Sequence, residues 1–207
     1  MGQPTIFIRL GGCNLNCSIC DTKYARKPIN SLSSREILKL IKSFKTPYIC
    51  ITGGEPLIQK KNLKPFINEL LKMKKIVSIE TNGSILVDKL PKAIKKVIDV
   101  KTPSTGEGKS FDLKNLKHIT KNDEIKFVIS NKKDFDFSIE FIKTHNIQKF
   151  NVPILFSPNL SVKGLASDLV RWILKSGLPI VFQPQLHKLI KEKPIYLLTH
   201  KNQTTDK

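Results

Sequence analysis

Residues 9–24 read RLGGCNLNCSICDTKY and place three of the chain's four cysteines in one short loop. The three stand in a Cys-x3-Cys-x2-Cys spacing, as Cys13, Cys17 and Cys20, directly after the apolar and β-branched run TIFIRL at 5–10. Thiolates at this spacing can bend around one compact centre, and no fourth sulfur or histidine stands between them. The stretch therefore predicts a strand that leads into a metal-binding loop.

Six further runs rich in β-branched and aromatic residues follow the first one. They lie at 48–54, 76–83, 97–103, 124–130, 150–158 and 178–184. A helical pattern follows most of these runs. Alternation of strand and helix, with continuously apolar strands, predicts an α/β fold in which helices cover a parallel sheet. About six such units are too few for a complete eight-stranded barrel.

Capping residues and apolar spacing predict the helices. Ser33 and Glu36 have the spacing of a capping box, and Pro47 stops the helix that follows. The next helix repeats one apolar face through Leu63, Phe66, Ile67 and Leu70. Later helices are predicted at 87–96, 136–143 and 165–176, the last of them ended by Gly177 as a C-terminal cap.

The loops after the predicted strands are the least apolar and most glycine-rich parts of the sequence. They read GGCNLNCSICDT, TGGEP, ETNGS, KTPSTGEG and FSPN. In parallel-sheet folds ligands bind beyond the carboxyl ends of the strands, where successive loops converge. We therefore expect the functional site at this edge of the sheet.

Composition favours one soluble domain over 1–200, with a disordered tail at 201–207. No stretch approaches the roughly 18 apolar residues of a membrane span, and no secretory signal is visible, so we expect a cytoplasmic protein with reduced thiols. The 36 Lys and Arg against 17 Asp and Glu give a formal charge of +19. The lysines recur on polar helix sides, as Lys39, Lys42 and Lys45 do, so we interpret them as a solvated face and expect no direct nucleic-acid binding.

Two kinds of metal centre remain open for the cysteine loop. A structural zinc site has four protein ligands, and Cys50 in YICIT would complete it only if its thiol reached the loop; a buried thiol fits that apolar context better. A basic zinc-containing RNA-binding module would also need stacking aromatics, which one Trp and three Tyr hardly provide. An iron–sulfur cubane held by three cysteines instead leaves one iron open to a small molecule.

The cysteine loop after a first strand, followed by GGEP at 53–56 after the second, resembles the radical S-adenosylmethionine (SAM) superfamily. The resemblance implies a partial (β/α)6-type barrel with a mostly parallel sheet. It also implies a [4Fe-4S] cluster on Cys13, Cys17 and Cys20, whose open iron binds SAM. The chain departs from the usual pattern at Ile19, where most members have an aromatic residue.

Seven short sequence motifs narrow the resemblance to the 7-carboxy-7-deazaguanine synthases. They are FIRLGGCNLNC, CDTKYA, TGGEPL, ETNGS, KTPS, DEIKFVI and QPQLHK, and they run from Phe7 to Lys188. The resemblance implies a carbon–nitrogen lyase that contracts 6-carboxy-5,6,7,8-tetrahydropterin to 7-carboxy-7-deazaguanine with loss of ammonia, on the route to queuosine and archaeosine in tRNA. It further implies SAM as a cofactor, Mg2+ on the substrate carboxylate, flavodoxin or ferredoxin as reductant, and a homodimer.

The same resemblance assigns substrate and magnesium residues. Arg9 would bind the substrate carboxylate with its planar fork, unless it is a surface ion-pair partner. Thr22 would be a Mg2+ ligand, or else a helix cap. Thr52 would lie at the substrate, and His187 in QPQLHK would contact the pterin, unless it is an ordinary surface histidine.

SAM is assigned to the rim loops. Glu55 would shape its loop or face the SAM ammonium, with an exposed turn carboxylate as the alternative, and Glu80 and Asn82 would bind the ribose or simply form a turn. The glycines of GGEP would let the backbone approach SAM closely. The complete set is Gly53, Gly54, Glu55, Glu80, Asn82, Lys101, Thr102, Pro103, Ser104, Phe156, Ser157, Pro158 and Asn159.

One sequence motif of the family is missing from this chain. Members carry a Gln-Gly-Glu-Gly strand before the GQPTIFIRL segment, whereas this chain starts at Met1-Gly2-Gln3. Either the start lies upstream, or the chain is a shortened variant with a weakened substrate pocket. A glycyl-radical-enzyme activase, which uses the same SAM chemistry on a partner protein, is the alternative function.

Overall fold

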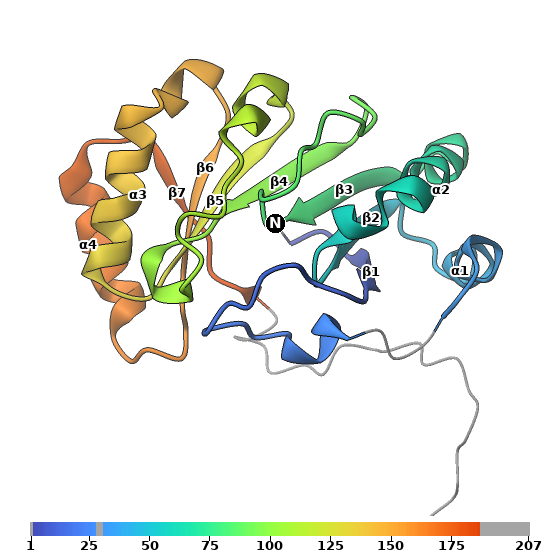
Figure 1. The fold of residues 1–207 in the computed structure, drawn as a ribbon, viewed down its shortest axis with the longest axis horizontal. Coiled ribbons are helices and arrows are strands. Elements are labelled where there is room, and N and C mark those ends of the chain that lie inside the picture. Colours follow the sequence, from blue (N-terminus) through green and yellow to red (C-terminus); the bar gives the residue numbers. More distant parts are fainter. Residues whose placement is uncertain (1, 28–30, 187–207) are drawn as a thin grey trace, which may run out of the picture.

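A computed structural model of the protein describes residues 2–27 and 31–186. Its centre is one sheet of seven parallel strands, arranged in the order of the chain from β1 to β7 (Figure 1). The strands are β1 (Thr5–Leu10), β2 (Tyr48–Gly53), β3 (Ile76–Thr81), β4 (Lys95–Val100), β5 (Glu124–Ile129), β6 (Ile154–Pro158) and β7 (Ile180–Phe182). The sheet is open, with β1 and β7 at its edges, so the expected partial barrel is confirmed.

All seven strand predictions are confirmed, and so are most of the helices. The helices are α1 (Ser34–Ile41), α2 (Lys60–Lys72), α3 (Lys132–Thr144) and α4 (Leu165–Ser176). Ser33 and Glu36 form both hydrogen bonds of the capping box before α1. Gly177 ends α4 with φ of 66°, a backbone conformation that glycine adopts without steric cost. The prediction at 136–143 is too short, since α3 begins four residues before 136.

The helix predicted at 87–96 is wrong. The chain there forms turns and then enters β4 at Lys95. Pro91 lies in the middle of the segment and cannot donate a helical hydrogen bond. Val87 instead donates its N–H to the side chain of Asn115 at 2.9 Å, which comes from η4 (Leu113–His118). A contact distant in the sequence thus replaces the local pattern.

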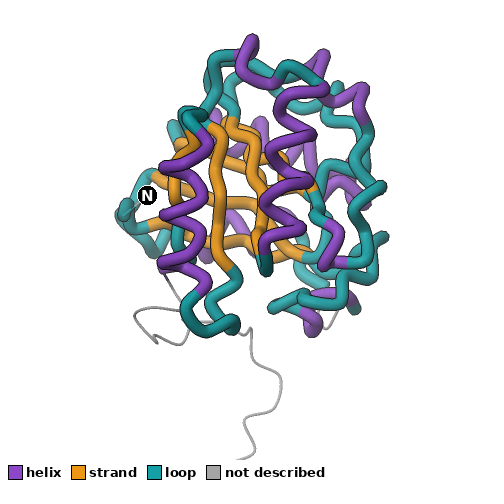
Figure 2. Tube along the Cα trace, turned by 90° about the vertical axis from the view of Figure 1, so that its left-hand side faces the viewer, coloured by secondary structure: helices purple, strands orange, loops and turns teal. Residues whose placement is uncertain are grey.

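Helices α1 to α4 pack on one face of the sheet (Figures 1 and 2). Alternate strand residues, such as Ile51, Ile79, Ile98 and Phe127, are fully buried in this layer. The residues between them point to the opposite, concave face, which none of the four described α-helices covers. Within the described ranges no helix is long and apolar enough to span a bilayer.

Candidate active site

The cysteine loop crosses the carboxyl edge of the sheet and is closed at its base. The N–H of Gly12 donates to the carbonyl of Ala25 at 2.9 Å, so the loop begins and ends at one place. Arg26, from η1 (Lys23–Arg26), donates to the side-chain oxygen of Asn16 and to the carbonyl of Cys17. One guanidinium therefore holds the middle of the loop.

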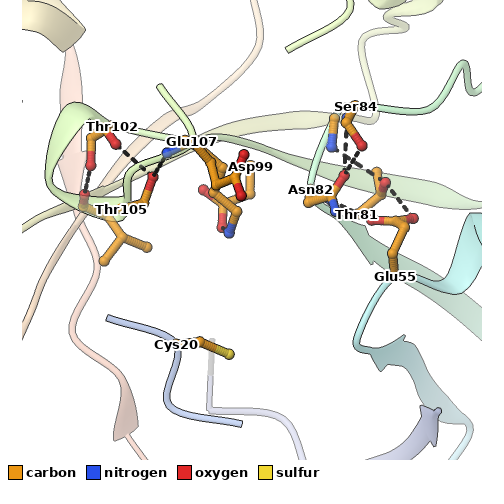
Figure 3. A network of polar contacts seen from close by, with 12 residues as sticks. Cys20, Glu55, Thr81, Asn82, Ser84, Asp99, Thr102, Thr105 and Glu107 are labelled. Atoms are coloured by element: carbon orange, nitrogen blue, oxygen red, sulfur yellow. Dashed lines mark hydrogen bonds and ion pairs between the residues drawn. The ribbon is translucent and has the colours of Figure 1, made fainter. Parts of the chain in front are cut away.

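The loop is also fixed to the segment after β4. Ser18 donates its N–H to the carbonyl of Thr105 at 2.9 Å and its hydroxyl to the carbonyl of Ser104 at 2.7 Å. The N–H of Asn16 donates to Oε1 of Glu107 at 2.8 Å. Figure 3 shows this side of the site, with Thr102, Thr105 and Glu107 joined by hydrogen bonds and Cys20 on a separate segment. The loop therefore has a defined position on the sheet.

Cys13, Cys17 and Cys20 are half-buried free thiols, and Cys50 is a buried free thiol. Burial raises the pKa of Cys50 to about 12, so this thiol stays protonated in strand β2, as its apolar context predicted. Among the residues that the structure describes, no three His, Cys, Asp or Glu side chains gather closely enough to hold a single metal ion. The fit to an iron–sulfur cluster rests on the donor set: three unpaired thiols on one loop.

A cation lies beside these thiols. Nζ of Lys101 pairs with Oδ2 of Asp99 at 2.8 Å at the end of β4. Burial opposes the charge of Lys101, but Asp99 and the nearby Cys17 and Cys20 outweigh it and raise the pKa of Lys101. Burial likewise raises the pKa of Cys17, and Lys101 opposes that shift. Lys101 is thus a fixed positive charge next to the proposed cluster ligands.

The glycines of GGEP serve the protein's own packing. A Cβ on Gly53 would lie 2.1 Å from the carbonyl oxygen of Leu10, and one on Gly54 would lie 2.1 Å from that of Gly12. The N–H of Gly54 donates to Leu10 at 3.0 Å, and that of Glu55 donates to Gly12 at 2.7 Å. Close approach of two backbones therefore requires these glycines, whether or not SAM also lies beside them.

Glu55 shapes its loop, and its carboxylate does not face solvent. Its side chain is fully buried and accepts hydrogen bonds from the N–H groups of Leu57 and Asn82 and from the hydroxyl of Thr81. Figure 3 shows this cluster, which joins the loop after β2 to the loop after β3. Glu55 therefore has the loop-shaping role that the sequence analysis offered and is not an exposed turn carboxylate, while its assignment to the SAM ammonium stays a prediction.

Asn82 links the loop after β3 to the cysteine loop. Its Nδ2 donates to Oδ1 of Asn14 at 3.1 Å and lies 4.0 Å from Sγ of Cys13. Its Oδ1 accepts from the N–H and the hydroxyl of Ser84. The turn alternative for Asn82 and a contact with the cysteine loop are therefore both present in the structure.

The other predicted residues of the first strands lie on the concave face or beside it. Arg9 is exposed, forms no ion pair within the described residues, and stands with its guanidinium carbon 6.0 Å from the ring centroid of Tyr24. Thr52 is its neighbour on β2 by register, and Glu80 is half-buried on β3. Thr22 precedes η1, but its side chain makes no capping hydrogen bond.

The residues assigned to SAM after β4 and within and after β6 differ in their burial. The side chain of Phe156 is fully buried against Phe127 and Phe135 on the helix-facing side, so its assignment to SAM is corrected to the core. Thr102 is also fully buried and donates to the carbonyl of Val128.

The remaining residues of these loops have partners in the protein or end an element. Pro103 begins η3 (Pro103–Thr105), and Asn159 donates to the hydroxyl of Ser130. The buried Ser157 donates to the carbonyl of Gln183, and Pro158 ends β6.

His187 and the tail at 201–207 lie outside the described residues, so the predictions made for them stay predictions.

The sequence analysis did not identify two carboxylates that hold loops at the carboxyl edge of the sheet. Glu107 holds the cysteine loop, as described above. Asp134, fully buried at the start of α3, accepts from the N–H groups of Ser104 and Ser130 and so joins the loops after β4 and β5. The sequence analysis missed Asp134 because it placed the start of the helix at 136; with the helix beginning at Lys132, Asp134 falls in the first turn, where acidic residues are common.

Comparisons with known proteins agree with this geometry. The sequence profile of the Radical SAM superfamily matches residues 7–146. The chain is 37% identical over 201 residues to the 7-carboxy-7-deazaguanine synthase of Koribacter versatilis, covering 91% of this chain and 89% of that protein. It is 40% identical over 191 residues to the synthase of the same name from Methanospirillum hungatei, with 91% and 78% covered.

Solved structures share the fold. QueE from Escherichia coli superposes with a TM-score of 0.72 at 23% identity, covering 89% of this chain and 87% of the other. Streptococcus suis SuiB, solved with S-adenosylmethionine bound, gives a TM-score of 0.60 at 16% identity, covering 87% of this chain and 50% of the other. These two likenesses concern the arrangement of strands and helices.

Proposed function

The chain belongs to the radical SAM superfamily and, within it, to the 7-carboxy-7-deazaguanine synthase family, and we propose that it converts 6-carboxy-5,6,7,8-tetrahydropterin to 7-carboxy-7-deazaguanine with loss of ammonia. The observation that carries the proposal is the loop with three free thiols, held on the carboxyl edge of a parallel sheet in a chain with these relatives. The product would enter the synthesis of 7-deazapurine nucleosides of tRNA.

Cys13, Cys17 and Cys20 would hold the [4Fe-4S] cluster of the superfamily. When bound, the cluster and SAM together supply the radical chemistry that starts the ring contraction. Arg26 and Glu107 keep the cysteine loop in place from its two sides. The loops containing Gly54 and Lys101 flank it and are the places where we propose that SAM binds.

Substrate and magnesium would lie on the concave face. Arg9 would bind the substrate carboxylate, because among the described residues its guanidinium donates only to the carbonyl of Gly53, at 3.4 Å, and its planar fork suits two oxygens. Thr52 lies next to Arg9 by register. Thr22 would bind Mg2+ through its hydroxyl oxygen, which makes no capping hydrogen bond and lies 3.8 Å from Sγ of Cys20.

The partners follow from the same membership. A reducing electron-transfer protein would supply the electron, and the net charge of +19 would favour an acidic donor such as flavodoxin or ferredoxin. We also propose a homodimer, which sedimentation velocity would test, and a location in the cytoplasm, where the cluster thiols stay reduced.

Anaerobic reconstitution tests the function directly. Protein with iron and sulfide restored should convert the carboxypterin in the presence of SAM, Mg2+ and a strong reductant, with product identified by mass spectrometry. Cleavage of SAM without turnover of the pterin would favour the activase alternative. Zinc in place of iron and sulfide on elemental analysis would contradict the whole proposal.

A further inference from the structure

Lys126 lies in the middle of β5, between residues that belong to the core. Ile125, Phe127 and Ile129 are fully buried on the helix-facing side. Because side chains alternate along a strand, Lys126 points to the concave face, where it is half-buried. By register it is the neighbour of Asp99 and lies two residues beyond Glu124, hence nearer the carboxyl edge.

Its ammonium has no protein partner within the described residues. The charged groups around it are already paired: Asp99 binds Lys101 through one oxygen, and Lys95 binds Glu124. The other oxygen of Asp99 is buried without a hydrogen-bond partner, so even this neighbour does not engage Lys126. A half-buried charge without a partner costs folding free energy, because it loses part of its hydration and gains nothing in return.

Two more charged side chains without ion pairs in the described part of the chain face the same space. Arg9 on β1, Glu80 on β3 and Lys126 on β5 all lie close enough to Cys50 to influence its pKa. Strands β1 and β5 are separated by three others in a curved sheet. Arg9 and Lys126 therefore face the concave space from different strands, and a ligand in that space would meet both cations.

We propose that Lys126 is a substrate-binding residue whose ammonium donates a hydrogen bond to the ring carbonyl oxygen of the pterin, while Arg9 binds its carboxylate. The inference rests on the proposed function. The substrate carries two oxygen acceptors along one edge of its ring system, a carboxylate on one ring and a carbonyl on the other. A carboxylate suits the two-pronged guanidinium of Arg9, whereas a single carbonyl oxygen suits the compact charge of a lysine.

The test measures binding of two ligands to the reconstituted protein with SAM, under anaerobic conditions, by calorimetry. One ligand is the carboxypterin, and the other is tetrahydropterin, which lacks the carboxylate. The variants are Lys126→Met, Lys126→Arg and Arg9→Ala. Lys95→Met is the matched control, because Lys95 lies on the same face of the neighbouring strand but nearer its amino end and is paired with Glu124.

Lys126→Met should weaken binding of both ligands by about 10- to 100-fold, the usual worth of one hydrogen bond from a charged group. Arg9→Ala should weaken only the carboxypterin, and Lys126→Arg should restore part of the loss. SAM binding should be unchanged by Lys126→Met, and thermal stability should stay the same or rise, since an unpaired charge is removed. Lys95→Met should bind both ligands like the wild type.

Wild-type affinity of Lys126→Met for both ligands would overturn the inference. So would a loss confined to the carboxypterin, or weakened SAM binding with pterin binding intact. A fall in thermal stability without a change in affinity would make Lys126 structural and overturn it as well. The wild-type protein is assayed before any variant is made. If it neither binds nor converts the pterin, the proposed function is contradicted, which is a different result from the failure of the inference on Lys126.

Discussion

Glu55 and Asn82 join two loops of the rim through one hydrogen bond, in which the N–H of Asn82 donates to Oε2 of Glu55 at 2.7 Å. The other carboxylate oxygen accepts from Thr81 at 2.8 Å and from Leu57 at 2.9 Å. Asn82 in turn contacts the cysteine loop through Asn14. One buried carboxylate thus fixes the loops after β2 and β3 relative to each other and, through Asn82, to the three thiols.

Glu55→Ala should destabilise the protein by about 3–5 kcal/mol, because three buried donors lose their acceptor together. Urea unfolding followed by circular dichroism measures this loss. Glu69→Gln is the control, since Glu69 is exposed and, among the described residues, pairs only with Lys72 on the same helix, and it should cost less than about 0.5 kcal/mol. Equal effects of the two substitutions would mean that the Glu55 cluster does not hold the loops.

Gly54→Ala should prevent the loop after β2 from closing on the cysteine loop. The new methyl group would meet the carbonyl oxygen of Gly12 at 2.1 Å, and backbone on both sides leaves it little room to move. We expect a loss of more than about 3 kcal/mol in unfolding free energy, or no soluble protein.

Gly106→Ala provides the comparison. Gly106 has φ of 77°, but no atom lies within 4 Å of the point where an alanine methyl group would stand, so its substitution carries only backbone strain of about 1–2 kcal/mol. If Gly54→Ala were the milder of the two, the close approach of the two backbones would not be the reason for glycine.

Cys50 should be unreactive in the folded protein. Burial raises its pKa to about 12, so at pH 8 almost no thiolate is present, and an alkylating reagent should label only the other three cysteines of the metal-free chain. The folded state keeps the proton on Cys50 to a higher pH than the unfolded state does. The contribution of this group to the free energy of unfolding is therefore complete below the unfolded-state pKa of about 8.5 and is lost as the pH rises toward 12. Mass spectrometry of labelled protein, native and in urea, tests this.

Cys17→Ala and Cys50→Ala form a matched pair for the cluster. Cys17→Ala should abolish the iron–sulfur absorption and SAM cleavage with little effect on the fold, because its thiol is half-buried on a loop. Cys50→Ala should retain iron, sulfide and SAM cleavage. Retained SAM cleavage in Cys17→Ala, or loss of the cluster in Cys50→Ala, would contradict the assignment of ligands.

The strands could be predicted because each depends on its own residues. Apolar and β-branched runs specify strands that are buried on one side, and the order of the chain is also the order of the sheet. The helix at 87–96 was predicted from its apolar spacing although Pro91 argues against a helix there, and the contact that forms instead joins Val87 to Asn115, which is distant in the sequence. Tertiary contacts of this kind have no local signature.

The site also contains residues that could be identified from the sequence and features that needed the structure. The thiols and glycines were found because their chemistry depends on spacing, whereas the reason for the glycines, a close approach to Leu10 and Gly12, needed the structure. Phe156 was assigned to SAM by its motif, but strand alternation turns it into the core. The same alternation brings Lys126 to the concave face; its motif, DEIKFVI, was identified from the sequence, but no role was assigned to this lysine.

Arg9→Ala should separate substrate binding from SAM chemistry. Arg9 contacts only the carbonyl of Gly53 at 3.4 Å and the ring of Tyr24 among the described residues, so its loss should leave the fold and the cysteine loop intact. We expect kcat/KM for the carboxypterin to fall by about 100-fold or more, the worth of a charge-assisted pair of hydrogen bonds, while SAM cleavage without substrate stays at the wild-type rate. Arg9→Lys should recover part of the activity, because it restores the charge but not the fork. Unchanged turnover in Arg9→Ala would show that another residue binds the carboxylate, and a parallel loss of SAM cleavage would place Arg9 with the cofactor.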